Sequence, residues 1–272
     1  TFASKIEYPV LAITRNVKDK TDSDKIQWVE GTLDEAGVAP LSSKLEGVDV
    51  IVELTGANPQ LFLVVEKIVA TVKPKLFIPS QFGTELHDAS KIFPNFLSLK
   101  TEHSENTRSA GIKTVDIITS FFADKKSFLY EIVAHAGIDK ESKTVTYFGN
   151  PDQKAIGFTT LNDIGRVVAA VATADPASLP NTIRVTSGEV SFREVKEKYE
   201  QTHKVELTEK EVDAGEALKQ AQAKYESGFD FKDFLYYLQV LASQGKDKGI
   251  TFSTDERELV NPGESLWKWE KY

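Results

Sequence analysis

Three basic residues in the sequence could carry chemistry. Arg15 directly follows the apolar run 8–14, and its planar guanidinium can hold a phosphate through two parallel hydrogen bonds. Lys18 could assist it, although a solvated basic loop is the alternative interpretation. Lys100 carries an ammonium that could polarise a substrate oxygen or transfer a proton. Taken alone, Lys100 is interpreted more simply as a surface lysine.

Other catalytic patterns are absent from the sequence. Phe96 stands four residues before Lys100, where a Tyr-x-x-x-Lys pair would place a phenol on the same helix face. Proton transfer would therefore fall on the lysine alone. No G-x-S-x-G run occurs, there is no cysteine, and no metal site is predicted because the histidines lack metal-ligand spacing. His103, three residues after Lys100, is expected to be exposed.

Elements that could position these residues alternate along the first half of the chain. Short apolar runs predict strands, and the first of them, at 8–14, is expected to be a buried parallel strand. A 3.6-residue period predicts a helix over 58–72, and a second helix is expected over 95–110, closed by Gly111. The strands are predicted at 8–14, 26–29, 47–54, 75–79, 114–119, 144–148 and 182–186, and further helices at 161–174, 192–202, 214–224 and 229–241.

This alternation of strands and helices predicts an α/β fold with a doubly wound parallel sheet. After Phe121 the pattern loosens, and a smaller, mainly helical C-terminal region is expected. At 161–174, Asn162 and Asp163 are the predicted cap of a helix. We therefore expect a first domain over 1–125 and a second region over 126–272, with 182–187 returning to the sheet.

Composition limits the class of partner. The net charge is −8 and the basic residues form no stripe, so direct nucleic-acid binding is not expected. No apolar run approaches the roughly 20 residues that span a bilayer, so no membrane association is expected. The absence of cysteine fits a reducing compartment, and a cytoplasmic location is expected.

Three segments resemble the NmrA-like and isoflavone-reductase-like family, which consists of atypical short-chain dehydrogenases/reductases. The first comprises Ala-Ile-Thr-Arg at 12–15, Val-Glu-Gly-Thr-Leu-Asp at 29–34 and Gly-Val-Asp-Val-Ile at 47–51. The second is Phe-Ile-Pro-Ser-Gln-Phe-Gly at 77–83, where the family usually has glutamate in place of Gln81. The third is Lys100 in a helix, followed by a strand and Ser-Phe-Phe at 120–122. The likeness runs from about residue 8 to about residue 188.

The resemblance implies an NADP-binding Rossmann fold. Arg15 takes the place of the acidic residue that binds the ribose in NAD-preferring proteins, which suits the 2′-phosphate of NADP. Lys100 is the implied catalytic group, which also holds the nicotinamide ribose. The cofactor-binding residues that we predict in this way are Arg15, Lys18, Thr55, Gly56, Pro79, Ser80, Gln81, Phe82, Lys100, Ser120 and Phe121.

The family's glycine-rich phosphate-binding turn has no counterpart in this sequence. The first glycine is Gly31, and no G-x-x-G-x-x-G run occurs. Residues 1–5 match the end of the helix that follows the turn, so we expect the first strand and the turn to precede Thr1.

The resemblance implies an NADPH-dependent reductase of a small, aromatic or enone-type molecule. The alternative is an NADP(H)-binding redox sensor that regulates a partner protein without turnover. A third hypothesis is a degenerate scaffold that binds no nucleotide. Lys100 favours the enzyme, whereas Phe96, Gln81 and the absent turn leave the sensor open.

Overall fold

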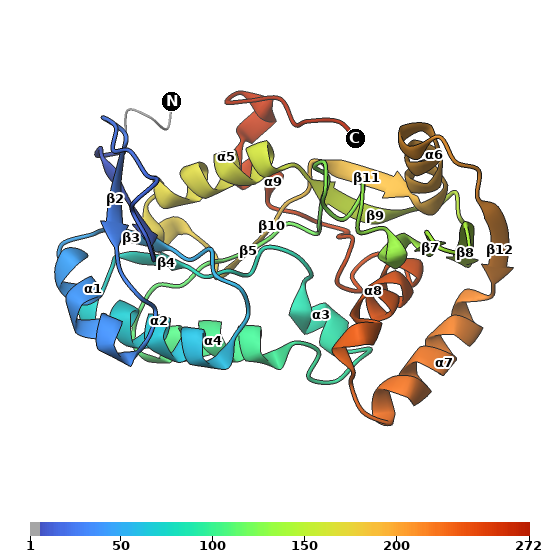
Figure 1. Cartoon of the computed structure of the whole chain (residues 1–272), viewed down its shortest axis with the longest axis horizontal. Coiled ribbons are helices and arrows are strands. Elements are labelled where there is room, and N and C mark those ends of the chain that lie inside the picture. The colour runs from blue at the N-terminus through green and yellow to red at the C-terminus, as the bar shows by residue number, and fades with distance from the viewer. Residues whose placement is uncertain (1–5) are drawn as a thin grey trace. The chain divides into compact units, whose positions relative to one another are not determined.

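The computed structural model describes residues 6–272 and divides them into two compact units. Unit 1 contains the chain up to Gln81 together with Ser98–Ile117 and Val168–Thr182, and unit 2 contains Phe82–Leu97, Ile118–Val167 and Ile183–Tyr272. Figure 1 labels most of the elements of both units. Residues 1–5, which were expected to end the helix after the glycine-rich turn, lie outside the described residues.

Unit 1 is built from parallel strand pairs and helices. β1 (Val10–Thr14) pairs in parallel with β2 (Ile26–Glu30), and β3 (Val50–Val52) pairs in parallel with β4 (Leu76–Ile78). A parallel bridge joins Phe77 of β4 to Thr114, just before β5 (Asp116–Ile118). The helices of this unit are α1 (Val38–Lys44), α2 (Pro59–Val72) and α4 (Ser98–Ser109). Parallel strands joined by helices confirm the predicted α/β class.

Helix α2 forms where the periodicity predicts it. The Asn58 side chain accepts the backbone N–H groups of Gln60 and Leu61, and Pro59 occupies the first turn, where its missing N–H costs nothing. Its buried face packs with α1, β1 and β3 around Leu41 and Ile68. The amphipathic pattern of 58–72 is therefore confirmed.

Strand β1 corrects one expectation. The run 8–14 was predicted to be a buried strand, yet Val10 is 47% exposed and Ile13 is 36% exposed. Within residues 6–272, β1 pairs with β2 alone, and Leu11 is its member in the apolar cluster beneath α1. A strand with one neighbour and one covered face keeps much of its apolar surface in contact with solvent.

Unit 2 holds two three-stranded sheets and a larger apolar core. In one sheet, β9 (Lys154–Thr159) lies between antiparallel β11 (Gly188–Ser191) and parallel β6 (Phe121–Phe122). In the other, β8 (Thr144–Phe148) lies between parallel β12 (Thr208–Val212) and antiparallel β7 (Ile138–Asp139). The helices are α3 (Leu86–Ser90), α6 (Phe192–His203), α7 (Ala214–Glu226), α8 (Phe234–Ser243) and α9 (Arg257–Val260).

Two elements run from one unit into the other. α5 (Leu161–Ala172) begins in unit 2, and β10 (Thr182–Arg184), which neighbours β5, begins in unit 1. At the start of α5, the Thr160 hydroxyl accepts the N–H of Asp163, so Thr160 is the capping residue. Asp163, predicted as part of the cap, is buried in the first turn and accepts the Ser187 hydroxyl.

Candidate functional site

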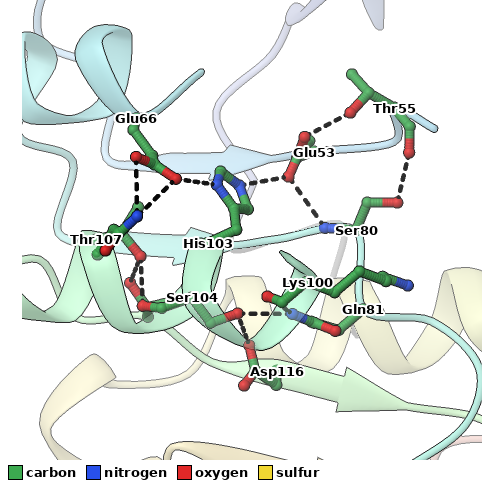
Figure 2. Close-up of polar contacts among 12 residues, drawn as sticks. Glu53, Thr55, Glu66, Ser80, Gln81, Lys100, His103, Ser104, Thr107 and Asp116 are labelled. Carbon is green, nitrogen blue, oxygen red and sulfur yellow. Dashed lines mark hydrogen bonds and ion pairs between the residues drawn. The ribbon is translucent and has the colours of Figure 1, made fainter. Parts of the chain in front are cut away.

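The candidate site of unit 1 begins where β3 and β4 end. Glu53 continues the ladder by donating its N–H to the carbonyl of Ile78 at 2.8 Å, and its side chain is buried. Its carboxylate accepts the Thr55 hydroxyl at 2.5 Å and the Ser80 N–H at 3.2 Å. The Ser80 hydroxyl donates in turn to the Thr55 carbonyl at 2.8 Å. The loops after two parallel strands are thereby joined through one carboxylate (Figure 2).

The side chain of His103, on α4, contacts the Glu53 carboxylate. Its Nε2 is 3.1 Å from the Glu53 carboxylate, and its Nδ1 is 2.7 Å from that of Glu66 on α2. The imidazole stacks on Phe62 with 4.1 Å between ring centroids, and Phe77 contacts it edge-on at 5.8 Å. The expectation that His103 is exposed is therefore wrong, since only 2% of it is accessible. The polar ring can be buried because both of its nitrogens lie within hydrogen-bond distance of carboxylates from other elements.

These contacts move the pKa values of the buried groups. Burial opposes the charged forms, but the hydrogen bonds to Glu53 and Glu66 raise the pKa of His103 above 6.5. Burial would likewise raise the pKa of Glu53, yet the bonds from His103 and Thr55 bring it below 4.5. Both shifts favour an ion pair of carboxylate and imidazolium at neutral pH.

Lys100 lies one helical turn before His103 on α4. Its side chain is half-buried, and burial lowers the pKa of its amine to about 8, although the charges of Glu53 and Asp116 act in the opposite direction. Such an amine changes its protonation state close to neutral pH, as a proton-transfer group requires. In Figure 2 the Lys100 side chain points to the same side of the view as Ser80 and Thr55.

Gln81 holds the start of α4. Its side-chain amide donates to the Lys100 carbonyl at 2.5 Å and to the Ser104 hydroxyl at 2.8 Å. Ser104 donates onward to Asp116 at 2.7 Å, and Asp116 pairs with Arg108 at 2.7 Å. The Gln81 side chain is therefore bonded within the protein, and its backbone N–H donates to the Pro79 carbonyl at 2.7 Å.

The other predicted residues of unit 1 lie at strand ends and contribute no side-chain hydrogen bond to this network. Arg15 and Lys18 follow β1 and are exposed, and Pro79 is buried directly after β4. Gly56 borders open space, because a methyl group added there would meet no atom within 4 Å. The structure therefore brings together Thr55, Ser80, Gln81 and Lys100 through shared hydrogen bonds and close packing, and leaves Arg15 and Lys18 at the surface.

Three predicted residues belong to unit 2. Phe82 is half-buried, and the Ser120 hydroxyl lies 2.8 Å from the carbonyl oxygens of both Gly157 and Ile250. Phe121 packs on the ring of His135 with 4.2 Å between centroids.

Phe96 also belongs to unit 2, where it is buried and stacks on Phe234. Helix α4 begins at Ser98 rather than at residue 95, because Asn95 and Leu97 have positive φ angles and break the helix. Phe96 and Lys100 therefore do not share a helix face, contrary to the prediction.

Sequence reasoning missed Glu53 and Glu66. Both interrupt apolar runs, Val-Ile-Val-Glu-Leu at 50–54 and Leu-Val-Val-Glu-Lys-Ile at 63–68. A lone acid within a predicted buried strand signals a partner elsewhere, since a charge is buried only when it is paired. That signal could have identified Glu53, but it does not indicate which residue is the partner.

The parallel strand pairs and the polar groups at their carboxyl ends define a Rossmann-type α/β protein. The chain belongs to the NmrA-like family, whose profile matches residues 1–259, and the predicted resemblance is confirmed. A comparison of the sequence with curated proteins found no significant match.

Solved structures with a similar fold include reductases and an epimerase. Isoflavone reductase is similar with a TM-score of 0.61 and 18% identity over 85% of this chain and 78% of that one. A nucleoside-diphosphate-sugar epimerase from Staphylococcus aureus gives a TM-score of 0.60 and 15% identity over 96% and 88%. The leucoanthocyanidin reductase–NADPH complex from Vitis vinifera gives 0.57 and 16% over 86% and 76%. No helix within residues 6–272 has the length and apolarity to cross a membrane.

Proposed function

We propose that this protein is an NADPH-dependent reductase of a small, aromatic or enone-type molecule, with Lys100 as its catalytic residue. The observation that carries the proposal is the half-buried Lys100 amine, whose pKa of about 8 suits proton transfer. Reductases among the structures of similar fold support it, one of them solved with NADPH.

The proposed nucleotide-binding region is residues 1–125, and the proposed substrate region is 126–272. Arg15 is exposed at the end of β1, where its guanidinium is free to bind the 2′-phosphate of NADP with Lys18 beside it. Open space at Gly56 permits close passage of the nucleotide beside the backbone. The exposed arginine and the open glycine fit the cofactor at these two points.

Lys100 then performs the proton chemistry. When bound, NADPH supplies the hydride. The Lys100 ammonium polarises the substrate oxygen and donates a proton as negative charge develops there. Glu53 fixes the Thr55 and Ser80 loops, and Gln81 fixes the helix that carries Lys100. These contacts hold the donor in place.

The test is a screen of enones, quinones and phenylpropanoid-like compounds with NADPH. Lys100→Ala should lower turnover by about 100-fold or more, the usual range for a general acid. Nucleotide affinity should fall much less, and Lys100→Arg should not restore turnover fully because guanidinium holds its proton too firmly. Lys75→Ala, which removes a surface lysine paired with Asp49, is the control. Turnover unchanged in Lys100→Ala would remove Lys100 from the mechanism.

The second candidate is an NADP(H)-binding sensor without turnover. The Ser120 hydroxyl and the Gln81 side chain are already bonded within the protein, which favours a site with fewer groups free to act on a substrate. A wild-type protein that binds NADPH but reduces no compound in the screen would favour the sensor.

A further inference from the structure

A small cavity opens on the surface of unit 1 between α2 and the end of α4. Its volume is about 270 Å³, close to the lower end of the range for small-molecule pockets. Most of its walls are apolar, and the apolar side chains that line it are Leu63, Val69, Ala70, Ala110 and Ile112. A cavity of this size accommodates a single ring with a short substituent.

Small residues on both walls leave the cavity open. Ala70 on α2 and Ala110 after α4 are exposed and carry only methyl groups, so the walls leave space that longer side chains would occupy. Val69 and Ile112 are buried and give the cavity an apolar interior. A ring bound there would remove apolar surface from water.

Glu66 contributes the carboxylate that lines this cavity, and its side chain is 18% exposed. Its Oε1 lies 2.7 Å from Nδ1 of His103. Among the described residues, Oε2 accepts one hydrogen bond, from the Asn106 amide at the long distance of 3.3 Å. Because each carboxylate oxygen has two lone pairs, Glu66 keeps acceptor capacity beside the cavity.

The charges around the cavity favour a cationic ligand. Lys67 also lines the cavity, but it pairs with Glu35 at 2.6 Å, which offsets its charge. The imidazolium of His103 lies between Glu66 and Glu53, so one negative charge of this group is left without a cation. An ammonium would donate to Glu66, whereas an anion would meet a like charge there.

We propose that this cavity is a binding site for a small primary amine with a one-ring apolar body, whose ammonium pairs with Glu66 and whose ring packs on Val69 and Ile112. The site is distinct from the proposed cofactor position. In Figure 2, His103 lies between Glu66 and Glu53, and Thr55 lies beyond Glu53. The amine would therefore bind at the end of these contacts that is opposite to Thr55.

The experiment is an NMR titration of the whole chain with benzylamine at pH 7, without nucleotide. The probes are labelled alanine methyl groups, and the signals of Ala70 and Ala110 are assigned by their loss in Ala70→Leu and Ala110→Leu. Both should shift with a dissociation constant of about 1 mM, as expected for a ligand of so few atoms. Benzyl alcohol, which has the same ring without the charge, should bind about tenfold more weakly, and benzoate more weakly still. Equal affinities for benzylamine and benzoate, or no shift of the two methyl signals, would overturn the proposal.

Matched variants separate the charge from the cavity. Glu66→Gln should weaken benzylamine binding about tenfold and leave benzyl alcohol binding unchanged, whereas Glu46→Gln, at an exposed carboxylate after α1, should change neither. Ala70→Leu should abolish binding of both by filling the cavity, and Ala39→Leu, at an exposed alanine of α1, is its control. Because Ala70 is exposed, this variant should fold even if Glu66→Gln does not. Benzylamine binding that survives Ala70→Leu would contradict the proposed site.

The His103 ring supplies a readout in the wild-type protein. Benzylamine should shift the Nδ1 resonance of His103, because the ammonium would share Glu66 with that nitrogen, and benzyl alcohol should leave it in place. An unchanged Nδ1 resonance at saturating benzylamine would refute the pairing with Glu66.

The alternative occupant of the cavity is a second copy of this chain. Sedimentation that shows a dimer, its dissociation by Leu63→Glu and no benzylamine shift at Ala70 would together overturn the proposal in favour of self-association. None of these measurements involves NADPH or turnover, so this inference and the proposed function fail separately.

Discussion

Replacing His103 by leucine tests whether the buried ion pairs of His103 with Glu53 and Glu66 stabilise the fold of unit 1. Leucine keeps apolar contact with Phe62 and Phe77 but removes the cation between two carboxylates. The side chains of His103 and Glu53 are only 1% and 2% exposed, so the loss leaves a buried carboxylate without its cation. Breaking a buried pair in this way costs about 3–5 kcal/mol. We expect a loss of that size in the free energy of unfolding at pH 6.

The pH dependence of this loss has a defined sign. The pKa of His103 is raised in the folded protein, so its contribution is complete below 6.5 and is lost as the pH rises through the folded value. The pKa of Glu53 is lowered, so its contribution is complete above 4.5 and is lost as the pH falls through the folded value. The difference between wild type and His103→Leu should therefore be largest between pH 4.5 and 6.5.

The assay is urea unfolding, with hydrogen exchange of the α4 amides as the local readout. Adding Glu53→Gln to His103→Leu should recover about 1–3 kcal/mol, because an amide is cheaper to bury than an unpaired carboxylate. His87→Leu, at an exposed histidine of α3, is the control. A loss below about 1 kcal/mol, or strictly additive effects of the two substitutions, would refute the ion-pair interpretation.

Three further outcomes are expected. Arg15→Ala should weaken NADP binding by about 1.5–3 kcal/mol with little effect on NAD, and calorimetric titrations showing equal losses would remove Arg15 from recognition of the 2′-phosphate. Burial lowers the pKa of His135 from 6.5 to about 4, so its contribution to the stability of the folded protein is complete above pH 6.5 and falls as the pH drops from 6.5 toward 4. The urea unfolding midpoint of His135→Leu should therefore depend much less on pH in this range than that of the wild type. Gly137→Ala should destabilise the protein by about 1–3 kcal/mol or more, because φ is +80° and the new methyl would lie 2.1 Å from the Thr146 carbonyl oxygen. Gly111→Ala is the control, measured in the same urea titrations: Gly111 has the same φ but open space around it, so this substitution should cost less stability.

Local patterns were sufficient to predict much of the fold. The apolar face and the N-terminal cap of α2 depend only on residues close together in the sequence, so the pattern of 58–72 was enough to predict them. The strand at 144–148 was predicted with its observed ends. β12 was missed because Thr208–Val212 carries three charged residues and shows no apolar alternation. β9 was missed because its interior holds Gly157, where a methyl would lie 2.6 Å from the Ile250 carbonyl oxygen. The need for glycine at position 157 comes from Ile250, which lies far along the chain and could not be inferred from the local sequence.

The candidate site was only partly accessible to sequence reasoning. Motif order led to the prediction of Lys100 and the loop that contains Ser80, because both lie in segments that resemble the family. The His103 environment depends on Glu53 and Glu66, which stand 50 and 37 residues away in the chain. Without such partners, a histidine on a polar helix is expected to be exposed. The two carboxylates, distant in the sequence, are the reason that His103 is buried instead.

Gln81 shows how a departure from the family pattern can follow from packing. Its amide nitrogen is 2.5 Å from the carbonyl oxygen of Lys100, a contact that needs a donor on the side chain. A glutamate there would present a second acceptor to that carbonyl and would have to bind a proton at the cost of burial. Ser104 donates its own hydrogen to Asp116, so it also needs a donor from Gln81. The amide is thus the side chain that this arrangement of α4 requires, and the substitution keeps Lys100 in place rather than weakening its proposed role.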